Sequence, residues 1–281
     1  MYANQPGQKP FLRWAGSKRQ LLPTLVEYWR DSFSRYVEPF MGSACLFFYL
    51  RPEHALLSDI NTELVEAFAA VRDYPDSVYR RLTQFPLGEK GYYLVRAMDQ
   101  HCLTSVERGA RFIYLNRFCF NGLYRTNQAG KFNVPYSSAK TGRLLNWSEF
   151  VACSKELENI ELRCGDFQDV LNDEIKPGDF VYLDPPYAQA NQRISLQYGP
   201  QSFGLEDIDR LRSTVKEIDR KGAHFVLSYA DCDEATEAFG KWKSQKVSTY
   251  RNIAGFAVHR GPAMELIFSN IPKIVSIETD I

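Results

Sequence analysis

The chain has 281 residues, of which 44% are hydrophobic and 24% charged, and its 34 Lys and Arg residues balance 34 Asp and Glu residues. This composition is ordinary for a globular protein with a sizeable core, and the length suggests one large domain or one domain with an insertion. A net charge of zero counts mildly against a nucleic-acid binder, although the distribution of charge matters more than its sum.

Neither a membrane span nor a metal site is expected. No apolar stretch approaches the length of a membrane-spanning helix, and the polar start of the chain lacks the apolar segment of a signal peptide. The six cysteines are scattered without a C-x-x-C pair, and the four histidines do not cluster with them. We therefore expect reduced thiols, a cytoplasmic location and no structural zinc.

The first 70 residues alternate short apolar strands with helical stretches. The order strand, turn, helix, strand, acid, helix is typical of a βαβ unit. Asn61 or Thr62 is suited to cap the last helix of this unit. The expected strands are residues 35–40 and 55–57, and the expected helices are residues 21–26, 44–50 and 63–70.

Residues 71–150 break this rhythm, and we interpret them as an insertion. Helical stretches at 76–85, 91–102 and 106–116 lead into a polar, aromatic run whose Asn-Gly and Ala-Gly pairs are turn signals, which favours a β-hairpin. Between Glu107 and Arg143 there are seven basic residues, and Glu107 is the only acidic one. Seven Phe and Tyr residues alternate with the basic residues. A solvated basic face would explain the charge alone, but charges mixed with rings favour a surface that binds nucleic acid.

The α/β pattern resumes after residue 150 and brings carboxylates to strand ends. Asp59, Asp166 and Asp184 each follow an expected strand, and the carboxyl ends of parallel strands are where ligands bind in open α/β sheets. Asp59 lies seventeen residues after Gly42, close to the spacing at which a dinucleotide fold places an acid on ribose hydroxyls. Together these residues predict a cofactor that contains adenosine. The later expected strands are residues 160–163, 180–183, 223–228 and 265–269, and the later expected helix is residues 205–221.

The run Phe-Val-Tyr-Leu-Asp-Pro-Pro-Tyr at residues 180–187 is the most informative stretch. Its apolar half predicts a buried strand, and the two prolines end the ladder because neither can donate an N–H. A plain proline turn with a solvated acid would explain Asp184, but it gives no reason for the aromatic Tyr187 at a loop.

With these pieces in place, the chain resembles the DNA adenine-N6 methyltransferases of the Dam type, the α-ordered group or D12 class. The matching segments are FLRWAGSKRQL at 11–21, YVEPFMGSA at 36–44, LLSDIN at 56–61, FIYLNRFCFNGLYRTNQAGKFNVPY at 112–136 and VYLDPPY at 181–187. There is one departure, because Ala44 stands where the family's Phe-x-Gly-x-Gly motif usually has its second glycine.

The resemblance implies an α/β architecture, a Rossmann-like fold of methyltransferases that depend on S-adenosylmethionine (SAM). It also implies an inserted, mainly helical DNA-recognition domain carrying a β-hairpin. We expect residues 1–70 and 153–281 to form the catalytic domain and residues 71–152 to form the target-recognition insertion.

By the same resemblance, SAM is the cofactor. Asp59 would accept hydrogen bonds from its ribose hydroxyls, while Asp166 and Phe167 would hold its adenine. The methionine side of the pocket would be lined by Phe40 and Gly42. Trp14, Lys18 and Asp184 complete the expected cofactor residues, although a core role for Trp14 and a surface charge for Lys18 are plain alternatives.

The expected chemistry needs neither a metal nor a covalent nucleophile. The lone pair of an adenine amino group is delocalised into its ring, whereas a methyl on a sulfonium is already activated. Asp184 would accept one N6–H and the carbonyl of Pro185 the other, so that the nitrogen points at the methyl. Tyr187 would stack on the base after it is flipped out of the duplex.

Target recognition would fall to the insertion. Arg125 is suited to a bidentate contact with guanine, although a phosphate contact is nearly as good an explanation. Leu123 and Pro135 would contact a thymine methyl, Phe120 would wedge into the stack, and Arg13 would read a flanking guanine. Asn121 and Asn133 complete the expected DNA-binding residues, and NGLYR with FNVP favours GATC as the target.

Two other functions compete with this interpretation. One is an amino-methyltransferase acting on cytosine N4, on RNA or on a protein amide, and the other is an impaired relic that regulates by binding DNA. We expect a bacterial or phage-encoded protein that works as a monomer on double-stranded DNA, associated with the nucleoid, without a metal or a membrane. Residues 188–204 are expected to form a mobile loop that closes over the site.

Overall fold

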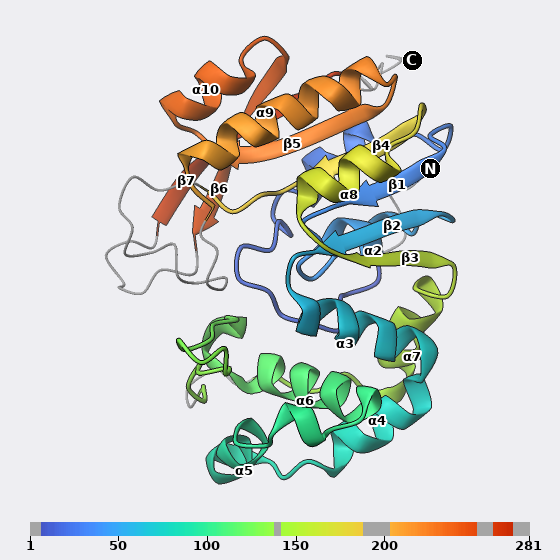
Figure 1. The fold of residues 1–281 in the computed structure, drawn as a ribbon, viewed down its shortest axis with the longest axis vertical. Coiled ribbons are helices and arrows are strands. Elements are labelled where there is room, and N and C mark those ends of the chain that lie inside the picture. Colours follow the sequence, from blue (N-terminus) through green and yellow to red (C-terminus); the bar gives the residue numbers. More distant parts are fainter. Residues whose placement is uncertain (1–6, 138–141, 188–202, 252–260, 272–281) are drawn as a thin grey trace, which may run out of the picture.

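The fold is taken from a computed structural model that describes residues 7–137, 142–187, 203–251 and 261–271 (Figure 1). Seven strands form one mixed sheet in the order β3-β2-β1-β4-β5-β7-β6, in which β7 runs antiparallel to both its neighbours and the other pairs are parallel. This arrangement confirms the α/β architecture expected from the sequence. The strands are β1 (Arg35–Glu38), β2 (Ala55–Asp59), β3 (Ile160–Cys164), β4 (Asp179–Leu183), β5 (His224–Ala230), β6 (Lys243–Arg251) and β7 (Gly261–Ser269).

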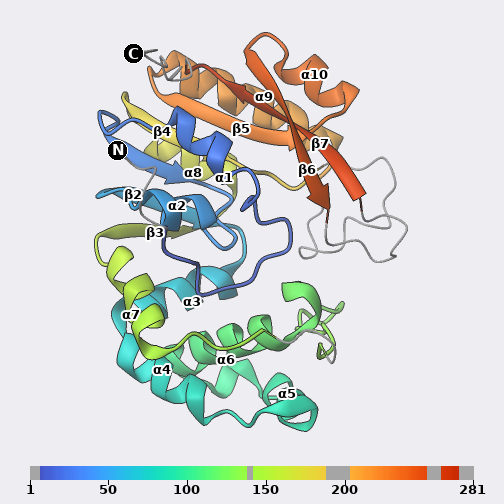
Figure 2. The same ribbon diagram turned by 180° about the vertical axis from the view of Figure 1, so that it is seen from behind.

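Helices cover both faces of the sheet. One face carries α8 (Phe167–Glu174), α9 (Leu205–Arg220) and α10 (Asp233–Phe239), which lie toward the viewer in Figure 1. The other face carries α1 (Leu22–Leu25) and α2 (Cys45–Leu50), which Figure 2 shows from the front. A single 3-10 turn, Val26–Tyr28, continues α1.

Alternation along each strand divides the core between these two layers. In β4, Val181 and Leu183 pack with the α8–α10 layer, whereas Phe180 and Tyr182 pack with the opposite one. All five residues of β4 are buried, as expected for a strand covered on both faces. The strand that leads to Asp184 is therefore held rigidly on both sides.

A layer of helices lies beyond the β3 edge of the sheet (Figure 1). It joins the sheet through α3, whose first turn is capped by the side chain of Asn61 as expected. Gly109 lets α6 approach α3 closely, because a Cβ atom there would come within 2.7 Å of the Ala70 Cβ. The helices are α3 (Thr62–Asp73), α4 (Pro75–Gln84), α5 (Gly88–Arg96), α6 (Ser105–Phe118) and α7 (Trp147–Glu156).

The segment expected to form a β-hairpin follows α6 directly. It begins with the 3-10 turn Phe120–Gly122 and folds back on itself through two isolated antiparallel bridges, Cys119 with Tyr136 and Thr126 with Phe132. The return path is irregular, with no continuous ladder among its described residues. We call residues 119–137 the recognition segment below.

Several expected elements differ in extent from those found. The helix expected at 91–102 divides into α5 and a 3-10 turn at Gln100–Cys102. No local sequence pattern predicted α7, α8, α10 or β6. Most of the loop expected at residues 188–204 lies outside the described residues.

Candidate active site

The carboxyl ends of β1, β2 and β4 place the turn at residues 39–44, Asp59 and Asp184 at one edge of the sheet. β1 lies between β2 and β4 with parallel register, so the three strands deliver their following residues side by side. Glu38, the last residue of β1, is buried between the other two carboxylates and accepts a hydrogen bond from the Tyr36 hydroxyl at 2.9 Å. Burial raises the pKa of Glu38 well above its ordinary value, although the Tyr36 hydrogen bond opposes this shift.

Asp59 is anchored by the backbone of the glycine turn. The Gly42 N–H donates to Oδ2 at 3.1 Å and the Asn61 N–H donates to Oδ1 at 3.0 Å. Burial raises the pKa of Asp59 to about 6, although these backbone donors oppose the shift. The carboxylate is therefore aimed by its surroundings and keeps lone pairs for further donors.

The turn needs glycine at residue 42. Gly42 has a φ of +46°, and a Cβ atom there would come within 2.8 Å of the Trp14 ring. Ala44, which replaces the family's second glycine, also adopts the left-handed region with φ +51°, and its methyl group is fully buried. This conformation disfavours a side chain by about 1–2 kcal/mol. The Ala44 backbone nevertheless keeps the shape that a glycine would give.

Asp184 lies beyond the end of β4 and is paired with Lys18. The Lys18 Nζ approaches Oδ1 at 2.8 Å, and the Ser228 hydroxyl donates to the same oxygen at 3.0 Å. Among the described residues, only these two donate to the carboxylate, and Oδ2 is left available. Burial raises the pKa of Asp184, although Lys18 and Ser228 oppose the shift.

Lys18 is not the exposed charge that the sequence left open, because it is buried among acids and rings. Its Nζ also lies 3.9 Å from the Glu265 Oε2 and 4.8 Å from the centre of the Tyr187 ring. Burial alone would lower the pKa of Lys18, but the charges of Asp184, Tyr187 and Glu265 raise it well above its ordinary value.

Tyr187 and Pro185 complete this part of the site. The Tyr187 ring packs against Tyr229 of β5 with centroids 5.0 Å apart, and Pro185 is buried in the turn. The structure therefore brings together the three residues that the sequence proposed for catalysis.

A second group of predicted residues lies at the start of α8. The Asp166 carboxylate caps this helix through the Gln168 N–H at 2.9 Å and is ion-paired with Arg210 of α9. The guanidinium of Arg210 also lies 4.9 Å from the centre of the Phe167 ring, and that ring lies 5.1 Å from Phe40. Asp166, Phe167 and Phe40 are thus adjacent, while Arg210 was not foreseen.

The recognition segment presents Arg125 in a defined orientation. Its Nε donates to the Asn133 Oδ1 at 2.8 Å, and the Asn133 N–H donates back to the Arg125 carbonyl at 3.0 Å. Arg125 is exposed, and no described residue makes a hydrogen bond to the two terminal nitrogens of its guanidinium. Nearby, Phe120 is 40% exposed and its N–H donates to the Pro135 carbonyl at 2.9 Å.

Two other predicted DNA residues are less available. Asn121 adopts the left-handed region with φ +56° inside a 3-10 turn. Leu123 is partly buried against the core.

The N-terminal segment connects the recognition segment to the site. Asn116 of α6 holds Arg13 by its backbone, accepting from the N–H at 2.8 Å and donating to the carbonyl at 2.5 Å. The Trp14 ring stacks on Tyr124 at 6.2 Å and on Phe112 at 6.5 Å. Because the Trp14 ring also lies against Gly42, it connects the recognition segment to the turn at residues 39–44.

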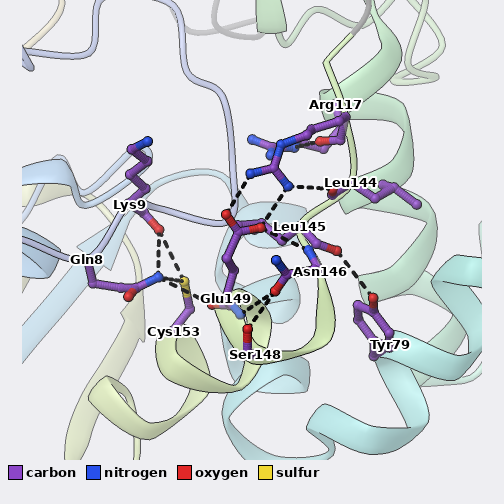
Figure 3. A network of polar contacts seen from close by, with 11 residues as sticks. Gln8, Lys9, Tyr79, Arg117, Leu144, Leu145, Asn146, Ser148, Glu149 and Cys153 are labelled. Carbon is purple, nitrogen blue, oxygen red and sulfur yellow. Dashed lines mark hydrogen bonds and ion pairs between the residues drawn. The ribbon is translucent and has the colours of Figure 1, made fainter.

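A polar network also ties the N-terminal segment to α7, because Gln8 Nε2 donates to the Glu149 carbonyl at 3.3 Å and the Cys153 thiol donates to the Lys9 carbonyl at 3.2 Å (Figure 3). Further along the segment, the Arg117 carbonyl accepts from the Arg13 Nη1 at 3.2 Å, and the Arg117 Nε donates to the Arg143 carbonyl at 2.8 Å. Arg143 forms a bidentate pair with Glu149 of α7, at 2.6 and 2.7 Å. Burial, then the charges of Arg13 and Arg143, lower the pKa of Arg117 to about 10.

The interpretation of residues 107–143 as a basic, ring-bearing surface was only partly right. Arg111 is buried and donates to the carbonyls of Val95 and Arg96 at the end of α5. Arg108 pairs with Glu66. Most of the alternating rings are also buried, because they fill the core of α4–α6. Within the recognition segment, the exposed basic and aromatic residues of this pattern are Phe120, Arg125 and Lys131.

The residues present fit an adenosine-containing cofactor. An aimed carboxylate at Asp59, a side-chain-free approach at Gly42 and the paired rings of Phe40 and Phe167 supply the polar and apolar contacts such a molecule needs. The part of the chain that the structure describes contains no group of three His, Cys, Asp or Glu side chains able to hold a metal ion. No helix within it is both long and apolar enough to cross a membrane.

Comparison with known proteins agrees with this geometry. Residues 14–253 match the family model of D12 class N6 adenine-specific DNA methyltransferases. The type II methyltransferase M1.LlaDCHI of Lactococcus lactis is 34% identical, over 95% of this chain and 97% of its own length. The type II methyltransferase M.MjaIII of Methanocaldococcus jannaschii is 34% identical over 78% and 83%, and the DNA adenine methylase of Haemophilus influenzae is 29% identical over 92% and 92%.

Proposed function

This chain belongs to the D12 class of N6 adenine-specific DNA methyltransferases, and from that premise we propose that it methylates adenine N6 within GATC in double-stranded DNA, using SAM. One observation carries the proposal. Asp184 follows a fully buried strand with Oδ1 held by Lys18 and Ser228, and no described residue donates to Oδ2, which can accept a hydrogen bond from an amino group.

In the proposed mechanism, this chain positions an amino nitrogen. When bound, SAM supplies an activated methyl group on a sulfonium. Asp184 accepts one N6–H through Oδ2, and the carbonyl of Pro185 accepts the other. The negative carboxylate then stabilises the positive charge that develops on N6, and the rigid turn maintains its aim.

The proposed cofactor contacts involve two groups of residues, one at the glycine turn with Asp59 and one at the start of α8. Asp59 accepts from the ribose hydroxyls, Asp166 and Phe167 hold the adenine, and Phe40 with Gly42 lines the methionine. The rings of Phe40 and Phe167 pack against each other at a tilt of 33°, with centroids 5.1 Å apart, and the Asp59 oxygens are already aimed by backbone donors. Trp14 and Lys18 support this pocket from the N-terminal segment.

Base flipping supplies the target. An adenine inside a duplex cannot approach Asp184, and extruding it costs a few kcal/mol. Tyr187 offsets part of this cost by stacking on the base, at about 1–3 kcal/mol. Its ring is held against Tyr229 and beside Lys18, so it presents a fixed surface.

Arg125 is proposed to read guanine in the GATC target. A guanidinium whose Nε is fixed by Asn133 presents its two terminal nitrogens together, which suits bidentate hydrogen bonding to guanine O6 and N7. Leu123 and Pro135 are assigned to the thymine methyl, Phe120 to the base stack and Arg13 to a flanking guanine. Asn121 is assigned to the same DNA surface. We also propose that residues 71–152 act as the recognition unit and that the protein works as a monomer in the cytoplasm.

Methylation mapping tests this function. The purified protein is incubated with SAM and DNA that has never been methylated, and every methylated base is located by sequencing. N6-methyladenine confined to GATC is expected. N6-methyladenine in another motif would refute the assigned specificity, whereas methyl transfer only to cytosine or only to RNA would refute the assigned substrate.

A further inference from the structure

The Ser228 hydroxyl is a buried polar group whose only hydrogen-bond partners among the described residues are Asp184 and Tyr182. Ser228 is fully buried in β5, which runs parallel to β4 with Leu227 opposite Leu183. Its Oγ lies 3.0 Å from the Asp184 Oδ1 and 3.2 Å from the Tyr182 hydroxyl. A buried hydroxyl is costly unless it is hydrogen-bonded, so these contacts fix its orientation.

Counting protons gives the direction of each bond. A serine hydroxyl has one proton, and an ionised carboxylate can only accept. Ser228 therefore donates to Asp184, and the Tyr182 hydroxyl must donate to the Ser228 oxygen. The hydrogen bonds thus run from the Tyr182 hydroxyl to the Ser228 Oγ and from there to the Asp184 Oδ1. The same Oδ1 also accepts a hydrogen bond from Lys18.

We propose that Ser228 is a positioning residue for methyl transfer, oriented by Tyr182, and that with Lys18 it occupies Oδ1 so that Oδ2 faces the target amino group. This inference rests on the proposed function, because it assigns Asp184 as the acceptor. Without Ser228, a single donor would hold the carboxylate, and rotation about its Cα–Cβ and Cβ–Cγ bonds would no longer be stopped on that side.

The pKa of Asp184 is a readout that a purely structural role of Ser228 would not change. The groups that face or lie near this carboxyl are Lys18, Glu38, Cys45, Tyr182, Tyr187, Ser228 and Glu265. A donated hydrogen bond favours the ionised form. Removing Ser228 should therefore raise the pKa of Asp184 and move the acidic limb of the rate profile to higher pH.

The experiment compares Ser228→Ala, Ser228→Thr and Tyr182→Phe with wild type. The single-turnover methylation rate of Ser228→Ala should fall about 10- to 100-fold, the equivalent of one hydrogen bond to a charged group. Ser228→Thr keeps the hydroxyl and should recover most of that rate, and Tyr182→Phe should lose only a few-fold. SAM affinity should stay unchanged in all three.

Ser269→Ala is the matched control, because Ser269 is an equally buried serine of the same sheet. Its hydroxyl donates to the Phe225 carbonyl at 2.6 Å, remote from the carboxylates. It should lose stability without losing rate or shifting the pH profile. Thermal unfolding establishes that each variant is folded, and if Ser228→Ala does not fold, Tyr182→Phe and Ser228→Thr provide the comparison.

The outcomes separate this inference from the proposed function. Equal rates and equal acidic limbs for Ser228→Ala and Ser269→Ala would overturn the positioning role, as would a Tyr182→Phe rate identical to wild type when Ser228→Ala cannot be folded. A wild-type protein that methylates no DNA would instead refute the proposed function. The hydrogen bonds from Tyr182 to Ser228 and from Ser228 to Asp184 would then still be tested by NMR titration of the Asp184 carboxyl, whose pKa must rise in Ser228→Ala.

Discussion

Replacing Lys18 with methionine should destabilise the folded protein and leave Asp184 as an uncompensated buried acid. The two side chains are 9% and 18% exposed, and their charged atoms lie 2.8 Å apart. Methionine keeps the length of the lysine stem, so little cavity results. The substitution therefore removes the charge and its hydrogen bond with limited loss of packing.

The magnitude follows from the geometry. Two unit charges at this separation attract by about 6 kcal/mol in gross terms at an effective dielectric constant near 20, and the desolvation of Lys18 offsets part of that. Removing one partner of a buried pair typically costs about 3–5 kcal/mol. We expect about 3 kcal/mol, because Ser228 still donates to Asp184.

A double-mutant cycle measures the coupling. Urea unfolding of wild type, Lys18→Met, Asp184→Asn and the double variant should give a double variant that is more stable than the sum of the single losses predicts, by about 2 kcal/mol. Additive losses, to within about 0.5 kcal/mol, would refute the buried ion pair.

The same variant has a predicted pH dependence. Without Lys18 the pKa of Asp184, already raised by burial, rises further. A carboxyl whose pKa is higher in the folded than in the unfolded state stabilises the fold at low pH, and this stabilisation is lost as pH rises through the folded-state pKa. The deficit of Lys18→Met should therefore be smaller at pH 5 than at pH 8, and a deficit independent of pH would contradict this reasoning.

Three further predictions concern the turn at Gly42, the proposed ribose contact of Asp59 and the recognition segment. Gly42→Ala should lower stability by about 2–3 kcal/mol in thermal unfolding, because it combines an unfavourable φ with overlap against Trp14; an unchanged melting temperature would contradict this. SAM affinity should weaken by about fourfold between pH 7.5 and 5.5, because Asp59 has a pKa of about 6 and accepts hydrogen bonds best when ionised; the same decline in Asp59→Asn would assign it to another group. Arg125→Lys should lower kcat/KM on GATC by about 10- to 100-fold and relax selectivity at guanine, with Asn133→Ala following in the same direction; equal losses on every DNA sequence would indicate a phosphate contact.

The sequence anticipated what is encoded locally. The strand that precedes Asp184, the cap at Asn61 and the glycine turn before Asp59 each depend on neighbouring residues, and each is found where expected. Strand ends in a parallel sheet share one edge, so the grouping of Asp59 and Asp184 followed from topology alone.

What the sequence did not anticipate depends on distant partners. The polar strand β6 is stabilised by pairing along the whole of β7, which no local pattern shows. Ser228 and Glu265 reach the site only because β5 pairs with β4 and β7 pairs with β5. Arg111 looked like part of a charged surface, yet it is buried as a donor to the end of α5. Ser228 had one usable signal, its position near the end of an expected strand.

Single-turnover methyl transfer to a duplex containing one GATC site tests the central claim most directly. Wild type or folded Asp184→Asn, each in excess over the DNA, is mixed with the duplex and radiolabelled SAM. The labelled nucleoside is then identified. The account predicts N6-methyladenine from wild type and a rate at least about 100-fold lower in Asp184→Asn, in line with losing a key electrostatic contact. A folded Asp184→Asn protein that methylates adenine within a few-fold of the wild-type rate would contradict it.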